Sequence, residues 1–273
     1  MIPKGILVCV DYADILAVTL PYNRHHFRRL MVVTTPGDKQ TARLAHRHQA
    51  DVYKTDAFYD DGAHFNKWKA LEQGLDRIGR TGLMCILDAD ILWPSVITPM
   101  SYQHGYLYTP PRRVLSDVTK PIPPEGTWHA RPLFNDTEWA GYTQLFYAND
   151  PVLPTAPWHQ TDWIHAGGAD SFFQALWPRE RKLRPGFTVL HLGAPGANWV
   201  GRASQRVDGS MPAESASRRA VLRELMAARS RAPADDPYRA ERRKRPPDRW
   251  AEYAAELMGM PSKHLGDSLE CGT

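Results

Sequence analysis

The sequence predicts an α/β fold, a mixed and mostly parallel sheet flanked by helices, and three observations support it. Short apolar runs alternate with amphipathic segments along the first hundred residues. The chain has 273 residues and 42% hydrophobic content, enough to bury a substantial core. The run 83–87 is apolar throughout and is bounded by glycine and by charge, which is typical of a strand buried on both faces.

The chain opens with a strand, a helix and a second strand. We expect strands over 5–10 and 30–34, because both runs are short, apolar and rich in β-branched residues. The helix between them would be capped by Asp14 and would bend or break at Pro21. Two strands joined through a helix indicate a parallel pair.

The same alternation continues to the end of the first hundred residues. Pro36-Gly37-Asp38 predicts a turn, followed by a helix over 39–49 and an edge strand over 50–54. A second helix is expected over 65–78, where apolar residues recur at spacings of three and four, and it leads into the buried strand over 83–87.

Two carboxylates, Asp88 and Asp90, follow the buried strand directly. Ligands of open α/β sheets bind beyond the carboxyl ends of the strands, where carboxylates suit a hard cation and a phosphate. An isolated Asp-x-Asp is equally well explained by a turn or a helix cap. Its place after three strand–helix units therefore matters more than the motif itself.

Three strand–helix units, the segment FNKWKALEQGL and a strand ending in DAD together resemble the nucleotide-sugar-binding half of GT-A fold glycosyltransferases. The resemblance covers residues 5–202. It implies a Rossmann-like GT-A domain over 1–202, with a nucleotide-sugar-binding half (1–100) and an acceptor-binding half (101–202), before a basic helical extension over 203–273. It also implies transfer of a sugar from a nucleotide sugar, a UDP-sugar, with Mn²⁺ or Mg²⁺ as the cofactor.

The resemblance implies contacts to the donor from the ends of the early strands. Asp11, Thr35 and Asp38 match positions that border the base and ribose, and Asn66 and Lys67 match a polar pair near the sugar diphosphate. A lysine there would act as a point charge on phosphate. Two alternatives stay open: Asp38 would only stabilise a turn, and Lys67 would only be an exposed helix residue.

The second half is proline-rich over 101–160, which predicts long loops, where an acceptor would bind. Within it, 139–147 has strand character and is similar to the segment that approaches the donor sugar and acceptor. Four tryptophans either stack on a sugar or a base or simply pack in the core. They are Trp128, Trp139, Trp158 and Trp163.

Two later residues match the family's order. Asp170 stands near the start of a helix expected after Gly167-Gly168. This position resembles the one where inverting members of the family carry a catalytic carboxylate. His191, in a strand expected over 188–193, resembles the third protein ligand of the metal. The resemblance thus implies direct ligation by Asp90 and His191, with Asp88 acting directly or through water. If the reaction retains configuration, Asp170 would instead orient a substrate, and the sequence leaves this open.

The tail is basic. From Arg202 to Arg249 there are 13 basic and 7 acidic residues, so this segment is more positive than the whole chain, whose net charge is +4. We expect helices over 213–231 and 248–258, with an exposed cluster between them. That cluster comprises Arg242, Arg243, Lys244 and Arg245.

A cluster of four cations suits a polyanion, so one hypothesis is a DNA acceptor, such as a hydroxymethylpyrimidine modified by phage-type glycosyltransferases. The target base would then be flipped out of the duplex. A solvated helical surface explains the charge equally, and a saccharide, small-molecule or protein acceptor stays open.

Two functions from other classes also stay open. Hydrophobic-Asp-x-Asp begins phosphohydrolases of the haloacid dehalogenase type, although there it follows the first strand, and Leu92 stands here where they carry Thr or Val. The second is a nucleotide-binding module without catalysis.

No apolar run approaches the roughly 20 residues that cross a bilayer, and the N-terminus enters its first strand at once, so we expect a cytoplasmic protein, in the host cytoplasm if phage-encoded. Cys9 and Cys85 lie inside apolar strands and are expected as buried thiols rather than as a disulfide.

Overall fold

A seven-stranded sheet forms the centre of the structure, a computed structural model that describes residues 2–98, 100–128 and 141–231. The strand order is β3-β2-β1-β4-β8-β6-β9, and the pairs from β3 to β4 are parallel, whereas β8 is antiparallel to both β4 and β6. The predicted mixed, mostly parallel sheet is therefore confirmed. The strands are β1 (Lys4–Val8), β2 (Arg29–Thr34), β3 (Asp51–Lys54), β4 (Leu83–Asp88), β6 (Leu107–Tyr108), β8 (Thr143–Tyr147) and β9 (Lys182–Leu183).

A second, three-stranded sheet was not expected from the sequence. Its order is β5 (Ile91–Leu92), β10 (Val189–Leu192) and β7 (Arg112–Leu115), with β10 antiparallel to β5 and parallel to β7. In this register His191 lies opposite Ile91, and the backbone N–H of Leu192 donates to the carbonyl of Asp90 over 2.8 Å. The small sheet thus places a histidine of the second half beside the carboxylates of the first.

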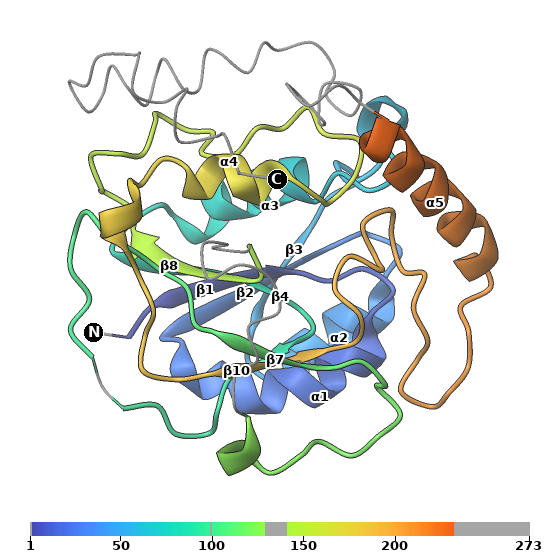
Figure 1. The fold of residues 1–273 in the computed structure, drawn as a ribbon, viewed down its shortest axis with the longest axis horizontal. Coiled ribbons are helices and arrows are strands. Elements are labelled where there is room, and N and C mark those ends of the chain that lie inside the picture. Colours follow the sequence, from blue (N-terminus) through green and yellow to red (C-terminus); the bar gives the residue numbers. More distant parts are fainter. Residues whose placement is uncertain (1, 99, 129–140, 232–273) are drawn as a thin grey trace.

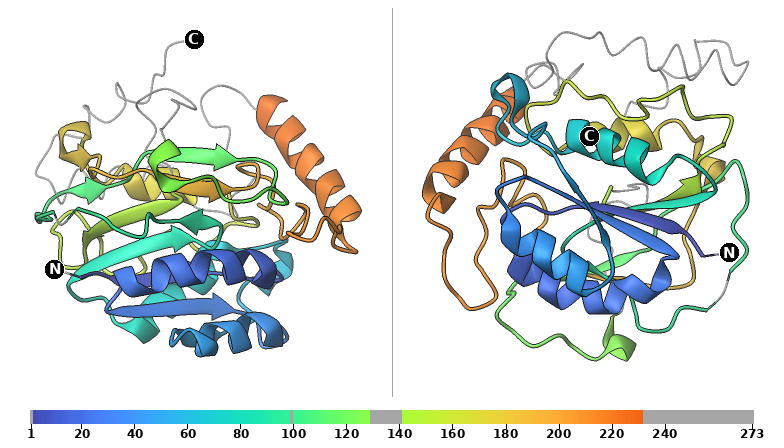
Figure 2. Two further views of the ribbon diagram at one scale, coloured as in Figure 1. Left: turned by 90° about the horizontal axis from the view of Figure 1, so that it is seen from below. Right: turned by 180° about the vertical axis from the view of Figure 1, so that it is seen from behind.

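Helices cover both faces of the central sheet (Figure 1). The helices α1 (Ala13–Asn23) and α2 (Lys39–Arg47) lie on one face, and α3 (Lys67–Ile78) and α4 (Ala169–Gln174) lie on the other. Each face has its own apolar core, which agrees with strands buried on both sides. The long helix α5 (Ser215–Arg231) runs beside these layers, as Figure 2 shows. The described residues also form four short 3₁₀ turns: Arg24–His26, Asp60–Gly62, Glu125–Thr127 and Arg179–Arg181.

Polar side chains cap the N-termini of two helices, and two of the helix starts differ from the sequence prediction. Asp38 caps α2 by accepting the N–H of Thr41 at 3.0 Å, and Asn66 caps α3 by accepting the N–H of Lys69 at 3.0 Å, so α3 begins after residue 66 and not at residue 65. The expected cap of α1 by Asp14 is wrong. No side chain caps this helix, and the Asp14 carboxylate instead pairs with a distant arginine.

Buried Glu72 links the two halves of the chain. It projects from α3, and its carboxylate accepts the backbone N–H groups of Trp158 and His159, both at 3.0 Å. Nδ1 of the His159 ring forms a third hydrogen bond, to Oε1 of Glu72 over 2.6 Å. The Arg80 guanidinium forms an ion pair with Oε2 of Glu72 over 2.7 Å. Trp158 and His159 belong to a loop without regular structure, so the Glu72 carboxylate fixes that loop to α3.

Several expectations fall on residues outside the described ones: Trp139, the cluster Arg242–Arg245 and the helix over 248–258. Cys9 and Cys85 are buried free thiols, as predicted. In the described part of the chain, no helix has both the length and the apolar character needed to cross a bilayer.

Candidate active site

A cavity of about 240 Å³ opens at the carboxyl ends of β1 and β4, and residues of β7, β10 and α4 complete its walls. Ligands of open α/β sheets bind at this edge. Five of the predicted site residues line the cavity: Lys67, Asp88, Asp90, Asp170 and His191. The structure thus brings together side chains that are up to 124 residues apart, counted from Lys67 to His191.

Asp88 is the last residue of β4 and forms an ion pair with Lys67, the first residue of α3. The Asn66 cap starts the helix at this point, so the lysine side chain emerges beside the strand end. Lys67 is buried, and its ammonium also lies 4.6 Å from the ring centroid of Trp68. A buried cation beside a carboxylate, open to a cavity, is a group that a phosphate could also engage.

Asp90 faces His191 across the small sheet. The imidazole Nε2 lies 3.5 Å from Oδ2 of Asp90, and the Tyr12 hydroxyl donates to the same oxygen over 3.5 Å. The other oxygen, Oδ1, is buried and accepts no hydrogen bond from any residue that the structure describes. Such an oxygen is costly to leave unsatisfied, so the geometry favours a ligand at this atom.

The two carboxylates differ in their tendency to ionise. Burial raises the pKa of Asp88, and the negative charge of Asp90 adds to the rise, while Lys67 opposes it. Burial acts on Asp90 in the same direction, but the charge and hydrogen bond of His191 outweigh it and hold the pKa of Asp90 below its usual value. Asp90 is therefore the more readily ionised of the two carboxylates.

The donor set partly fits a divalent cation. Among the described residues, no three His, Cys, Asp or Glu side chains converge closely enough to form a complete metal site. Asp90 and His191 nevertheless offer a carboxylate oxygen and an imidazole nitrogen, ligands that suit Mn²⁺. The unsatisfied Oδ1 of Asp90 makes this residue the firmer ligand. The remaining ligands would have to come from water or from a bound substrate.

Arg112 stands behind His191 and was not identified from the sequence. Its guanidinium donates to Nδ1 of His191 over 3.1 Å and lies 4.3 Å from the ring centroid of Tyr142. Because an arginine only donates, Nδ1 of His191 is the acceptor of this hydrogen bond. The only signal in the sequence was a pair of arginines after two prolines, within a segment expected as loop.

Asp170 lies in the first turn of α4, as expected, and lines the cavity. Its Oδ2 accepts the backbone N–H of Gly141 over 2.8 Å. The approach is so close that a Cβ on Gly141 would lie 2.2 Å from the Cβ of Asp170. Gly141 therefore allows the carboxylate to sit against the chain just before β8.

The four remaining candidates for donor contacts, three to the nucleoside and Asn66 near the sugar diphosphate, do not line the cavity. Asp38 is committed to its own chain, because it caps α2 and accepts the N–H of Asp11 over 2.8 Å. Asn66 uses its oxygen for the cap of α3 and its N–H₂ for the carbonyl of Thr161. Asp11 is exposed and lies 3.9 Å from Arg218, and Thr35 also stays outside the cavity. Their role as donor contacts stays a prediction.

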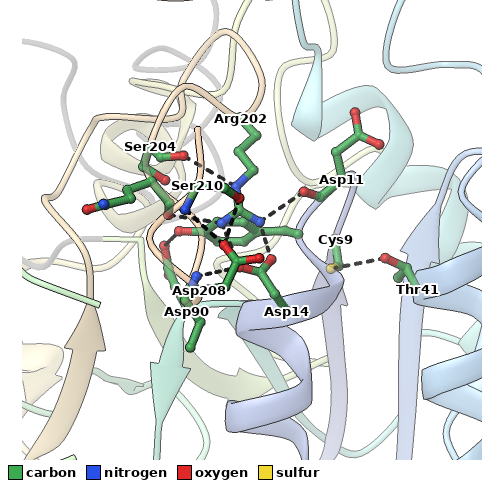
Figure 3. Close-up of polar contacts among 12 residues, drawn as sticks. Cys9, Asp11, Asp14, Thr41, Asp90, Arg202, Ser204, Asp208 and Ser210 are labelled. Atoms are coloured by element: carbon green, nitrogen blue, oxygen red, sulfur yellow. Dashed lines mark hydrogen bonds and ion pairs between the residues drawn. The ribbon is translucent and has the colours of Figure 1, made fainter. Parts of the chain in front are cut away.

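Buried Arg202 closes the cavity at the end of β1 (Figure 3). Its guanidinium pairs with both oxygens of Asp14, over 2.8 Å for Nη2, and donates from Nη1 to the carbonyl of Asp11 over 3.0 Å. Nearby, the Asn198 amide donates to the Tyr12 hydroxyl over 3.1 Å. Residues 198–202 thereby form a wall of the site, which no local sequence signal predicts.

The tryptophans in the cavity are not those singled out from the sequence. Trp68 and Trp199 line it, whereas Trp128, Trp158 and Trp163 are buried and do not. For these three residues, core packing is the better explanation.

No protein-family model matches the chain, and no curated protein matches it. Similar solved structures include glucosyl-3-phosphoglycerate synthase from Mycobacterium tuberculosis in complex with Mn²⁺, UDP and glucosyl-3-phosphoglycerate, at 16% identity and a TM-score of 0.45, covering 70% of this chain and 72% of that chain. A mannosyltransferase from Pyrobaculum calidifontis in complex with GDP-Man and Mn²⁺ matches at 16% identity and a TM-score of 0.44, covering 99% and 88%. At this level of identity and superposition, the function of this chain has to be argued from its own residues.

Proposed function

We propose that the protein is a metal-dependent glycosyltransferase that moves a sugar from a nucleotide sugar, a UDP-sugar in the first instance, to an acceptor hydroxyl. The observation that supports this most is the convergence of three carboxylates, a lysine and a histidine on one cavity at the carboxyl edge of the sheet. A charged leaving group, a cation to stabilise it and a carboxylate to take a proton are what such a transfer requires.

The wall that includes Asp90 would receive the donor diphosphate. Asp90 and His191 would hold a divalent cation, with Asp88 acting directly or through water. When bound, the cation would neutralise charge that develops on the departing diphosphate. Lys67, already desolvated beside Asp88, would add a positive charge to the same phosphates.

Asp170 would act on the acceptor. In an inverting reaction its carboxylate takes the proton of the acceptor hydroxyl as that oxygen bonds to the anomeric carbon. The bond from that carbon to the diphosphate oxygen breaks, and the nucleoside diphosphate leaves with the electron pair. In a retaining reaction the same carboxylate would orient a substrate. The N–H of Gly141 fixes Asp170 in either case.

The test offers UDP- and GDP-sugars with Mn²⁺ or Mg²⁺ to the protein, together with sugar, small-molecule, protein and hydroxymethylated DNA acceptors, and follows mass gain and nucleoside diphosphate release. We expect metal-dependent release of the nucleoside diphosphate from at least one donor. Donor binding without any release would instead favour a binding module. Hydrolysis of an aryl phosphate, with no release of nucleoside diphosphate from any nucleotide sugar, would favour a phosphohydrolase.

DNA as the acceptor is a finer hypothesis with a separate test. It rests on Arg242, Arg243, Lys244 and Arg245, which lie outside the described residues. Within α5, Arg218 and Arg219 donate to backbone carbonyls of residues 202 and 203, so these two cations serve packing. A DNA acceptor predicts retention of DNA at low salt and a steep loss of transfer as salt rises. No retention at low salt would contradict it.

A further inference from the structure

Positive charge gathers in α1, α2 and the segment between them. Residues 15–50 hold one lysine, five arginines and a single carboxylate, although the net charge of the whole chain is only +4. That carboxylate belongs to Asp38, which is buried and caps α2. The two helices lie side by side on one face of the central sheet (Figure 1). The charge of this segment is therefore almost unbalanced within the segment itself.

Three of these cations form a stripe on α2. Lys39, Arg43 and Arg47 follow one another at a spacing of four, so they lie along the same side of the helix. All three are exposed, and none of their side chains forms a hydrogen bond or an ion pair with any residue that the structure describes. Like charges at this spacing destabilise a helix. An anion from outside the chain would relieve that repulsion.

Alongside the cationic stripe, α1 presents a neutral one. Ala13, Ala17 and Pro21 share the spacing of four, and no charged residue follows Asp14 in α1. Ala17 and Pro21 are exposed. A groove of about 490 Å³ lies between the two helices, lined by Ala13 and Ala17 from α1 and by Gln40, Arg43, Leu44 and Arg47 from α2. The groove thus combines an apolar wall with a cationic one.

Among the described residues that line the groove, Asp14 is the only carboxylate. Both of its oxygens accept from Arg202, and one of them also accepts the N–H of Val207 over 2.9 Å. The charge of Asp14 is therefore balanced by Arg202 and not by the arginines of α2. Because Arg202 lines the catalytic cavity, this ion pair also lies between the groove and the cavity.

An anionic lipid surface matches both walls of the groove. Phospholipid headgroups supply phosphates for the cations of α2, and the apolar region just below them accepts small apolar side chains. Arginine and lysine suit such an interface because their aliphatic stems pack on apolar surface while their charged ends reach the phosphates. A nucleic acid would use the cations, but the neutral stripe of α1 would offer its phosphates no partner. The two stripes together favour lipid.

We propose that the groove between α1 and α2 docks the protein on an anionic phospholipid bilayer. Arg43 and Arg47 bind lipid phosphates, and Ala17 and Pro21 face the interface. Binding of this kind is peripheral and reversible. It goes beyond the proposed function and is tested without any sugar donor.

The first experiment measures sedimentation of the full chain with vesicles of phosphatidylcholine, alone or mixed with phosphatidylglycerol. We expect binding only to the anionic vesicles, and a loss of affinity of about tenfold or more in Arg43→Glu/Arg47→Glu. Arg179→Glu/Arg223→Glu is the control, because it makes the same change in net charge at two exposed arginines outside α1 and α2 and should keep most of the affinity. Wild-type affinity in the groove variant would overturn the proposal.

The second experiment tests the groove without removing a cation. Ala17→Glu adds a carboxylate to the wall opposite the arginines, whereas Ala17→Gln adds almost the same volume without charge. Ala17 is exposed, so both variants should fold, which urea unfolding checks. We expect Ala17→Glu to bind anionic vesicles about tenfold more weakly than Ala17→Gln. Equal binding by the two variants would show that the groove is not the docking site.

Other ligands would give different results. DNA retention that is lost in Arg43→Glu/Arg47→Glu, with no vesicle binding by the wild type, would assign the stripe to nucleic acid. Binding of inorganic phosphate or glycerol phosphate without vesicle binding would identify a site for small anions. Loss of vesicle binding in Arg242→Glu/Arg243→Glu, but not in the groove variant, would assign docking to the tail. Each of these three results would overturn the proposal.

Discussion

The two halves of the chain build their walls of the cavity in different ways. In the first half, β1 and β4 pair in parallel over five residues, and this register sets Val8 beside Asp88. In the second half, short strands and loops supply the walls, and polar contacts hold the side chains. The bond from Gly141 to Asp170 and the bond from Arg112 to His191 are of this kind.

The difference separates what backbone register determines from what side-chain chemistry determines. A residue at the end of a paired strand cannot shift without disturbing the sheet, so Asp88, the last residue of β4, is rigidly placed. Residues on short strands and loops can change by loop variation at little cost to the core. The first half is thus suited to a constant task, and the second to the choice of acceptor.

The largest effect should come from removing either of the two proposed cation ligands, Asp90 from the first half of the chain or His191 from the second. Asp90→Ala and His191→Ala should each lower metal-dependent transfer by about 10³-fold, since each removes a proposed cation ligand. Initial rates across a Mn²⁺ titration measure this, and calorimetry should show weaker Mn²⁺ binding. Asp117→Ala, which removes an exposed carboxylate, is the control. Full activity in either cavity variant would refute the assignment of the cation site.

A slightly smaller effect is expected from a change in the cavity wall formed by the second half of the chain. Asp170→Asn keeps an oxygen that can accept the Gly141 N–H, so the fold and nucleotide affinity should persist. Turnover should fall by about 10²- to 10³-fold, because the amide cannot take a proton. Single-turnover rates and nucleotide dissociation constants measure the two quantities separately. Normal turnover would exclude Asp170 as the base.

The link between the halves should appear in stability. Glu72→Ala leaves Arg80 and two backbone N–H groups without their buried partner, which should cost about 3–5 kcal/mol in the free energy of unfolding. Asp76→Ala removes the exposed partner of the same arginine and should cost less than about 0.5 kcal/mol. Urea unfolding measures both. Similar losses would mean that Glu72 is not the residue that joins the halves.

The pH dependence of stability gives a second test of Glu72. Burial raises its pKa, but the hydrogen bond and charge of His159 and the charge of Arg80 outweigh burial and lower the pKa below its usual value. A carboxyl with a lowered pKa in the folded state stabilises the fold above its unfolded pKa, and that contribution disappears as pH falls through the folded pKa. Wild type should therefore lose stability more steeply than Glu72→Gln below about pH 4.

The smallest effect on catalysis should come from adding one methyl group at Gly141, next to Asp170. Gly141→Ala places a Cβ against Asp170, so the carboxylate has to move. We expect kcat to fall about tenfold with nucleotide affinity unchanged, because misplacing a catalytic group by about 1 Å is costly. Gly126→Ala, where an added Cβ meets no atom within 4 Å, is the control. Unchanged kcat would show that the position of Asp170 is not critical.

The same contrast explains how far the sequence could predict the structure. The strands and helices of the first half, and the placement of Asp88 and Asp90, follow from hydrophobic periodicity, which is a local signal. A strand was expected over 188–193, where β10 lies, but the sheet that it forms with β5 and β7 was missed, because strands of two and four residues carry almost no periodicity. Arg112 and Arg202 were missed because their roles depend on partners far along the chain.

Asp14 shows why a local rule failed. Its position at the start of a predicted helix is typical of a cap, yet it is the second residue of α1 and its carboxylate binds Arg202, 188 residues away in the sequence. A bidentate ion pair with a buried guanidinium is stronger than a cap to a backbone N–H, so the tertiary contact determines the side-chain position. Only the folded structure identifies such a partner.

The contact between Asp14 and Arg202 also bears on how the protein is made. During synthesis the strands of the first half can leave the ribosome and pair while Arg202 has yet to be translated. Closing so long a loop is slow, so the end of the cavity beside β1 should be among the last parts to form. A nascent chain released before residue 198 would lack Asn198 and Arg202, which line the cavity in the folded protein.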